Sequence, residues 1–114
     1  MKEAAILRQI ADYLSAQRIF FFRLNTGSLF GGSERRWAFR AHSLGAGAAD
    51  ILALPAGLPP LWIEVKNQRG RQSQAQKEFQ QMVKDQGHEY VVARSIDDLP
   101  LTVGDRMPQS RNGK

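Results

Sequence analysis

The chain has 114 residues, of which 42% are hydrophobic and 24% are charged, and its formal net charge at pH 7 is +5. This composition predicts one globular domain with a modest core, and the lack of any run of about 18 apolar residues excludes a transmembrane helix. No cysteine is present, which excludes disulfides and cysteine-ligated zinc, and the basic balance favours a polyanionic partner such as nucleic acid.

Residues 1 to about 17 are expected to form an amphipathic helix. Their apolar side chains recur with the 3.6-residue period of a helix, and they are Ile6, Leu7, Ile10, Tyr13 and Leu14. Glu3 extends this row at the edge of the buried face. It acts either as a favourable anion at a helix N-terminus or as a third acid of a functional site. The segment is too amphipathic and too acidic for a secretion signal, so we expect a cytoplasmic protein.

The next segments predict β-structure. The apolar run at residues 19–25, IFFFRLN, is typical of a strand. Residues 34–42 interleave arginines with two aromatic residues, which predicts a strand or one arm of a hairpin. The arginines are candidates for contacting nucleic-acid phosphates while the aromatic rings stack on bases or sugars, and the alternative is a basic edge strand that resists aggregation. They are Arg35, Arg36 and Arg40.

The segment 47–66, GAADILALPAGLPPLWIEVK, predicts two short apolar strands joined by a turn rich in proline and glycine. Each strand carries an acid, because Asp50 opens the first and Glu64 interrupts the second. Side chains alternate along a strand, so Glu64 and Lys66 share a face. A hairpin whose loop is residues 55–60 puts Asp50 within about one residue of the Glu64–Lys66 pair.

Two interpretations fit these charged residues, because a buried isolated charge costs several kcal/mol and is normally paired or bound to metal. In the structural interpretation, Glu64 pairs with Lys66 and Asp50 caps a turn. In the functional one, Asp50, Glu64 and the backbone carbonyl of Val65 supply hard oxygen ligands for Mg²⁺. Lys66 then orients or deprotonates the attacking water, or stabilises charge in the transition state.

A second helix is expected to begin after Ser73 and to end at Gly87. Ser73 and Gln76 have the spacing of a capping box. Gln76 therefore either caps the helix or, with Lys77, points to the end of the preceding strand and contacts phosphate or water. The predicted apolar stripe of this helix is Phe79, Met82 and Val83.

The segments around this helix complete the predicted domain. The polar turn at 67–72 adds Arg69 and Arg71 to the basic residues. Residues 89–94 predict a third core strand, parallel to the strand that carries Glu64 because a helix connects the two. Residues 95–99 are typical of a short capped helix.

Taken in order, these features resemble the PD-(D/E)xK nuclease superfamily and, more narrowly, the VRR-NUC family of virus-type replication and repair nucleases. The resemblance covers residues 25–99 and adds the first helix. Asp50 and Glu64 look like the family's metal-binding acids, Lys66 like its catalytic lysine, Gln76 like its helix glutamine and Glu3 like its N-terminal glutamate. One departure is Ala49, where the family usually has a proline that stiffens the turn.

The resemblance implies an α/β domain with a restriction-endonuclease-like core, in which helices flank a mixed sheet in the order αβββαβ. We expect it to span residues 1–103, followed by a polar tail at 104–114. The implied activity is that of a Mg²⁺- or Mn²⁺-dependent DNA endonuclease. The implied catalytic residues are Asp50, Glu64, Lys66 and Gln76, and the implied metal ligands are Asp50, Glu64 and the Val65 carbonyl, with Glu3 as a further candidate.

Small members of the family are similar to Holliday-junction resolvases and act as homodimers, which implies branched DNA as the substrate and a second copy of the chain as a partner. The residues expected to contact the DNA backbone are Arg35, Arg36, Arg40, Arg69, Arg71 and Lys77. Two alternatives remain besides a flap or nicking nuclease. One is a non-catalytic module that binds nucleic acid, and the other is a structural or assembly protein whose charge is incidental.

Overall fold

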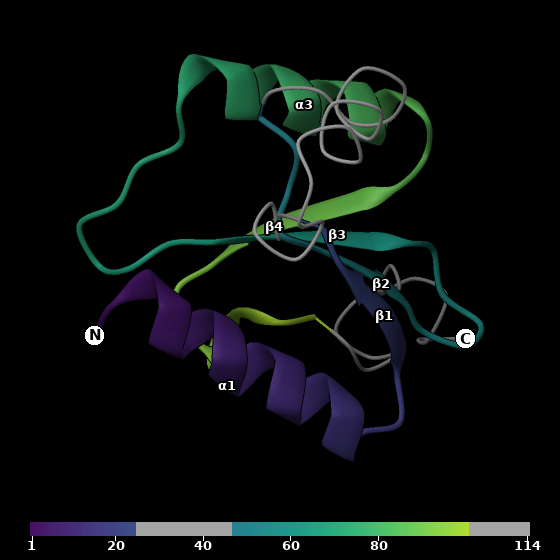
Figure 1. Ribbon diagram of the computed structural model, residues 1–114. Helices are drawn as coiled ribbons and strands as arrows, with labels where there is room; N and C mark the ends of the chain where they lie inside the picture. The colour runs from purple at the N-terminus through teal and green to yellow at the C-terminus, as the bar shows by residue number, and fades with distance from the viewer. Residues whose placement is uncertain (25–46, 101–114) are drawn as a thin grey trace, which may run out of the picture.

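The computed structural model describes residues 1–24 and 47–100. Within these ranges a four-stranded sheet in the order β1-β2-β3-β4 has helix α1 on one face and helix α3 on the other (Figure 1). The elements are α1 (Glu3–Ala16), β1 (Phe20–Arg23), β2 (Ile51–Leu54), β3 (Leu61–Val65), α3 (Gln74–Asp85), β4 (Glu89–Ala93) and the 3-10 turn η2 (Ile96–Asp98). The predicted order αβββαβ is confirmed, whereas the strand expected at 34–42 and the tail at 104–114 lie outside the described residues. No helix within the described ranges is long and apolar enough to cross a membrane.

The sheet is mixed, as expected. β2 is antiparallel to both β1 and β3, whereas β3 and β4 are parallel because α3 carries the chain back between them. The register of the hairpin differs from the prediction by one residue. A loop of 55–60 would pair Leu54 with Leu61, but the ladder between β2 and β3 pairs Ala53 with Leu61. Two prolines end the connection and cannot donate to the ladder, so β3 begins only at Leu61.

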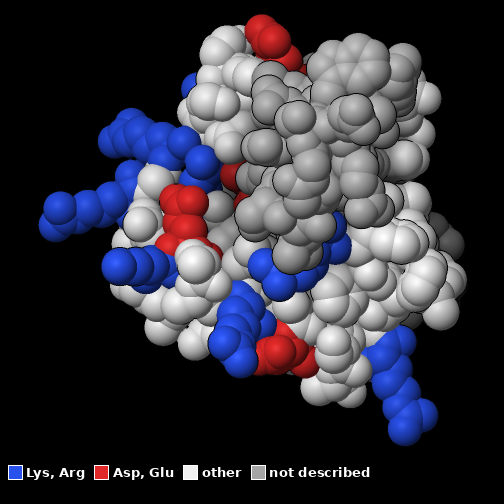
Figure 2. Space-filling model, in the orientation of Figure 1, with Lys and Arg blue, Asp and Glu red and all other residues white. Residues whose placement is uncertain are grey.

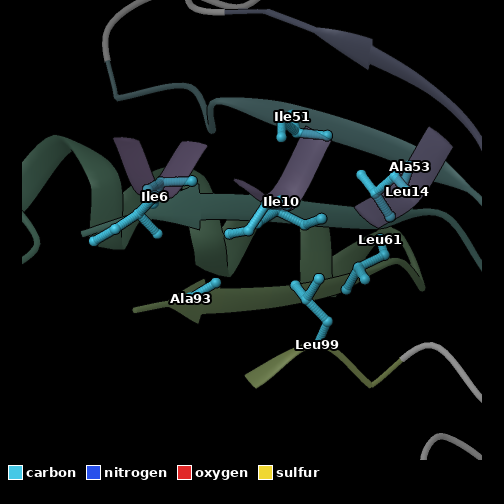
Figure 3. Packing of buried hydrophobic residues seen from close by; sticks show 10 residues of the cluster. Ile6, Ile10, Leu14, Ile51, Ala53, Leu61, Ala93 and Leu99 are labelled. Atoms are coloured by element: carbon cyan, nitrogen blue, oxygen red, sulfur yellow. The ribbon is translucent and has the colours of Figure 1, made fainter. Parts of the chain in front are cut away.

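The alternation along β3 divides the core into two layers. Leu61, Ile63 and Val65 point to α1, where the helix contributes Ile6, Ile10 and Leu14 (Figure 3). The other side chains of β3 point to α3, so Trp62 packs with Phe79 and Val83. The side chain of Glu64 lies on this second face, which places an acid inside the α3 layer.

Helix α3 ends as predicted but faces the sheet slightly differently. Gly87 follows the helix with φ of 86°, the left-handed conformation that a glycine adopts without strain. The side chains of Gln76, Phe79 and Val83 point to the sheet, and Met82 lies about 90° away around the helix axis. Met82 is therefore 55% exposed, and its predicted place in the apolar stripe is wrong.

Candidate active site

The carboxyl end of β3 and the start of β2 bring together the two acids of the sequence motif. Asp50 is 8% exposed and Glu64 is 3% exposed, and they are the two buried charged residues in the described part of the chain. The backbone N–H of Asp50 donates to the carbonyl of Ile63, and its carboxylate accepts a hydrogen bond of 2.8 Å from the N–H of Val65. The Asp50 side chain is thus held against the backbone of the residue that follows Glu64.

The carboxylate of Glu64 is only half satisfied. Its Oε2 accepts a hydrogen bond of 2.8 Å from Gln76 Nε2 and lies 3.6 Å from Lys66 Nζ. Its Oε1 is buried and has no hydrogen-bond partner among the described residues. Burial and, after it, the nearby charge of Asp50 raise the pKa of Glu64 to about 8, and Lys66 opposes both effects. At neutral pH the metal-free site therefore favours the protonated form of Glu64.

Gln76 caps α3 and also reaches the end of β3, while its contact with phosphate or water stays a prediction. Its Oε1 accepts from the N–H of Ser73 at 2.8 Å, and its own N–H donates to Ser73 Oγ at 3.1 Å, which completes the capping box of α3. The Nε2 of the same amide donates to Glu64. A glutamate here would cap the helix equally well but would present a second carboxylate to Glu64. The amide can therefore hydrogen-bond both Ser73 and Glu64, whereas a carboxylate could hydrogen-bond Ser73 only.

Lys66 and Glu3 both lie next to Gly70, in the turn that follows β3. The Lys66 side chain is 13% exposed. A Cβ at Gly70 would lie 2.9 Å from Glu3 Oε2 and 3.1 Å from Lys66 Cδ, so the glycine contacts both side chains. In the described residues no three His, Cys, Asp or Glu side chains are arranged to hold one metal ion. The part of Glu3 in a metal site, directly or through water, stays a prediction.

The groups at this strand end fit a hard divalent cation. Asp50 and Glu64 offer carboxylate oxygens, and the carbonyl of Val65 belongs to the same stretch of backbone. Mg²⁺ and Mn²⁺ prefer such oxygen ligands and usually keep several waters, so two protein carboxylates can suffice. The buried Glu64 Oε1 without a partner is the observation that favours this fit, because an unpaired buried acceptor is otherwise costly.

Exposed basic side chains lie on the two segments that follow Lys66 in the chain. Arg69 and Arg71 are exposed on the connection from β3 to α3, and Lys77 is exposed in the first turn of α3. Figure 2 shows lysine and arginine side chains extending around a group of acidic ones on the flank where this connection runs. The other basic residues predicted from sequence, Arg35, Arg36 and Arg40, lie outside the described residues.

Arg94 is a site residue that the sequence did not reveal. It follows β4, and its Nη1 donates to the carbonyls of Asn67 and, at 2.9 Å, Gly70. The contacts join residues 24 and 27 positions apart, so no local spacing predicts them. The turn itself could be predicted from the sequence, because Asn67 and Gly70 are typical turn residues.

Comparisons with known proteins agree with this architecture. No protein-family model matches the sequence, and no curated protein matches it either. A solved structure described as a VRR_NUC domain protein superposes on 86% of this chain and 81% of its own, with a TM-score of 0.64 and 21% sequence identity. At that identity the likeness shows the fold. The VRR-NUC fold predicted from the motif order is therefore confirmed.

Proposed function

We propose that this chain is a Mg²⁺- or Mn²⁺-dependent endodeoxyribonuclease that hydrolyses phosphodiester bonds in branched DNA such as four-way (Holliday) junctions. The observation that carries the proposal is the buried Glu64 carboxylate, which has one unpaired oxygen, lies beside Asp50 and is 3.6 Å from the Lys66 ammonium. The shared fold with a VRR_NUC domain protein supports the same reaction class.

Each side chain of the site has a distinct part in the proposed reaction. Asp50, Glu64 and the Val65 carbonyl would hold a divalent cation, which when bound would polarise the phosphate and lower the pKa of the attacking water. Val65 N–H holds Asp50, and Gln76 holds Glu64, so both carboxylates are oriented before substrate arrives. Lys66 orients the water and offsets the negative charge that develops on the phosphate. Water adds to phosphorus, the bond to the 3′ oxygen breaks, and that oxygen leaves with a proton.

The surrounding basic residues are proposed to hold the DNA backbone. Arg69, Arg71 and Lys77 are exposed and lie on the two segments that border Lys66 and Gln76. Contacts of this kind position a duplex without reading its bases. The proposal includes Arg35, Arg36 and Arg40 on sequence grounds alone. Selection of the substrate would then depend on the shape of the DNA and not on its sequence.

We also propose that the active form is a homodimer. One chain has one such site, and cutting both strands of a symmetric junction requires two sites related by a twofold axis. Strand β1, which lies at one end of the sheet formed by the described residues, supports this, because Phe20 is 63% exposed and Phe22 is 47% exposed. Their rings pack edge-to-face with centroids 5.1 Å apart, which forms a small apolar surface suited to a second copy.

The test is incubation of the purified protein with a labelled four-way junction, a flap, a nicked duplex and a plain duplex, with and without Mg²⁺ or Mn²⁺. We expect cation-dependent cleavage with preference for the junction. Cleavage of the flap or nicked duplex instead would keep the nuclease and change its substrate. Salt-sensitive binding without cleavage in either metal would indicate a non-catalytic module, which the pairing of Glu64 with Lys66 and Gln76 also allows. Absence of DNA binding would indicate a structural protein.

A further inference from the structure

The turn at residues 67–70 is closed by its own backbone and by one side chain. The N–H of Gly70 donates to the carbonyl of Asn67 at 3.2 Å and to Asn67 Oδ1 at 2.8 Å, and the N–H of Arg69 donates to the same Oδ1 at 3.1 Å. These bonds close the turn. Every partner belongs to the turn itself, so the bonds do not fix its position against β3, and local bonds of this kind open readily when a turn is not docked.

Arg94 supplies the contact that fixes the position. Its Nη1 donates to the carbonyl of Asn67 and to that of Gly70, the two ends of the turn. Its backbone is held in turn, because its N–H donates to Asp98 Oδ2 at 2.8 Å. The preceding carbonyl, that of Ala93, accepts from the N–H of Lys66 at 3.1 Å. The end of β4 therefore hydrogen-bonds both the backbone of Lys66 and the turn that follows Lys66.

The position of the turn matters because the Lys66 side chain packs along the backbone of Gly70, which we call the wall. A Cβ at Gly70 would lie 3.1 Å from Lys66 Cδ and 2.9 Å from Glu3 Oε2, which leaves no room for a larger residue unless a neighbour moves. A lysine has four rotatable side-chain bonds, and an unconfined one samples many conformations. The wall limits this freedom and directs the ammonium to the 3.6 Å contact with Glu64.

We propose that Arg94 is a positioning residue, which sets the 67–70 turn against Lys66 so that the lysine ammonium points into the site. The role of Arg94 in catalysis rests on the proposed nuclease function, whereas its role in holding the 67–70 turn against Lys66 does not. Both hydrogen bonds leave from one terminal nitrogen, Nη1, which lies one bond farther from the backbone than the ammonium of a lysine. We therefore expect a lysine at this position to fall short of the two carbonyls although it keeps the charge.

The first test measures the turn itself in metal-free protein. Amide hydrogen exchange of Arg69 and Gly70 is followed by NMR in wild type, in Arg94→Gln and in Arg94→Lys. We expect exchange at both amides to rise at least about tenfold in Arg94→Gln, with amides of the β3 ladder unchanged. Arg8→Gln is the matched control, because it removes an exposed arginine of α1 and should leave both amides as protected as in wild type. Unchanged exchange in Arg94→Gln would overturn the proposal.

The second test separates positioning from phosphate binding. We expect both Arg94 variants to lower the single-turnover cleavage rate about ten- to a hundredfold, while the junction Kd and its salt dependence stay as in wild type. If Arg94 bound phosphate instead, Arg94→Gln would weaken binding with a shallower salt slope and Arg94→Lys would restore it. That result would also overturn the proposal. Full cleavage by well-folded variants would do the same.

Gly70→Ala tests the same wall without touching Arg94, and it covers the case in which an Arg94 variant fails to fold. The added methyl group would lie 2.9 Å from the flexible end of Glu3 and 3.1 Å from Lys66 Cδ, so both side chains must shift. We therefore expect slower cleavage with unchanged junction binding. A rate equal to wild type would refute the role of the wall. If wild type itself cleaves no DNA, the nuclease proposal fails, and the exchange experiment still decides whether Arg94 holds the turn.

Discussion

The two faces of β3 are built from one five-residue strand and differ in what they contain. The face toward α1 is wholly apolar, and its large side chains are fully buried against the helix. The face toward α3 contains Trp62 and Glu64, with Asp50 beside them. A buried acid weakens a core unless something compensates it. The contrast indicates that the first layer gives the fold its stability and the second accepts a cost in stability to keep a site.

The other polar groups on the α3 face differ from Glu64, because they have hydrogen-bond partners within the protein. Trp62 Nε1 donates to His88 Nδ1 at 2.9 Å, and the hydroxyl of Tyr90 accepts from Gln72 at 3.2 Å. In the described part of the chain, the buried side-chain atom left without a partner is Glu64 Oε1. Structural polar groups of this layer are thus satisfied internally. The exception lies where the proposed cation would bind.

The largest expected effect comes from breaking the apolar face. Ile10 is fully buried in the α1 layer. Ile10→Ala should lower the free energy of unfolding by about 2–5 kcal/mol, because the methyl groups it removes leave a cavity. Urea unfolding measures this change. Cleavage per folded molecule should stay within about twofold of wild type at a temperature where the variant is folded. A proportionate loss of both quantities would mean that the two faces are not separable.

Removing Lys66 is expected to have the opposite pattern. Lys66→Ala should bind the junction as wild type does and lose cleavage by at least about a hundredfold, which corresponds to about 2.7 kcal/mol in the barrier. The free energy of unfolding should change little, because the lysine contributes to the site and not to the apolar layer. Gel-shift and single-turnover assays on one preparation give both numbers. Undiminished cleavage would remove Lys66 from the mechanism.

Replacing Glu64 by its neutral isostere should stabilise the metal-free protein and abolish its function. The folded-state pKa of Glu64 is raised to about 8, so between about pH 4.5 and 8 the unfolded chain has released a proton that the folded chain still holds. Wild-type stability therefore falls as pH rises through this window, and Glu64→Gln escapes that loss. We expect an advantage on the order of 2 kcal/mol at pH 8, little advantage at pH 4, and weaker Mn²⁺ binding.

Chemical denaturation at a series of pH values measures the stability difference, and calorimetry with Mn²⁺ measures the binding. Asp85→Asn is a suitable control, because Asp85 is exposed at the end of α3 and should show no such pH dependence. A Glu64→Gln protein that is less stable than wild type at pH 8 would contradict the assigned burial cost. Unchanged Mn²⁺ affinity would exclude Glu64 as a ligand.

The same contrast explains what the sequence could predict. The alternation along β3 and the Ser73–Gln76 spacing are local patterns, so the two faces and the cap of α3 followed from them. The hydrogen bond from Gln76 to Glu64 needs the angle at which α3 meets the sheet, which no spacing encodes. The contacts of Arg94 could not be predicted from the sequence, because its partners are backbone carbonyls and every residue type has one. The register of β2 against β3 was predicted one residue off, because it depends on how many residues the connecting loop takes up, and composition does not give that length.

The smallest expected effect concerns the basic rim. Arg71→Gln should weaken junction binding about two- to fivefold at moderate salt and reduce the slope of log K against log salt by about 1, because one phosphate contact is lost. The cleavage rate at saturating DNA should not change, since Arg71 is exposed and no described contact joins it to Glu64 or Lys66. Filter binding across a salt series measures the slope, with Arg8→Gln as the control for loss of charge. An equal change in the control would mean that binding depends on net charge alone, and a lower saturated rate would place Arg71 inside the site.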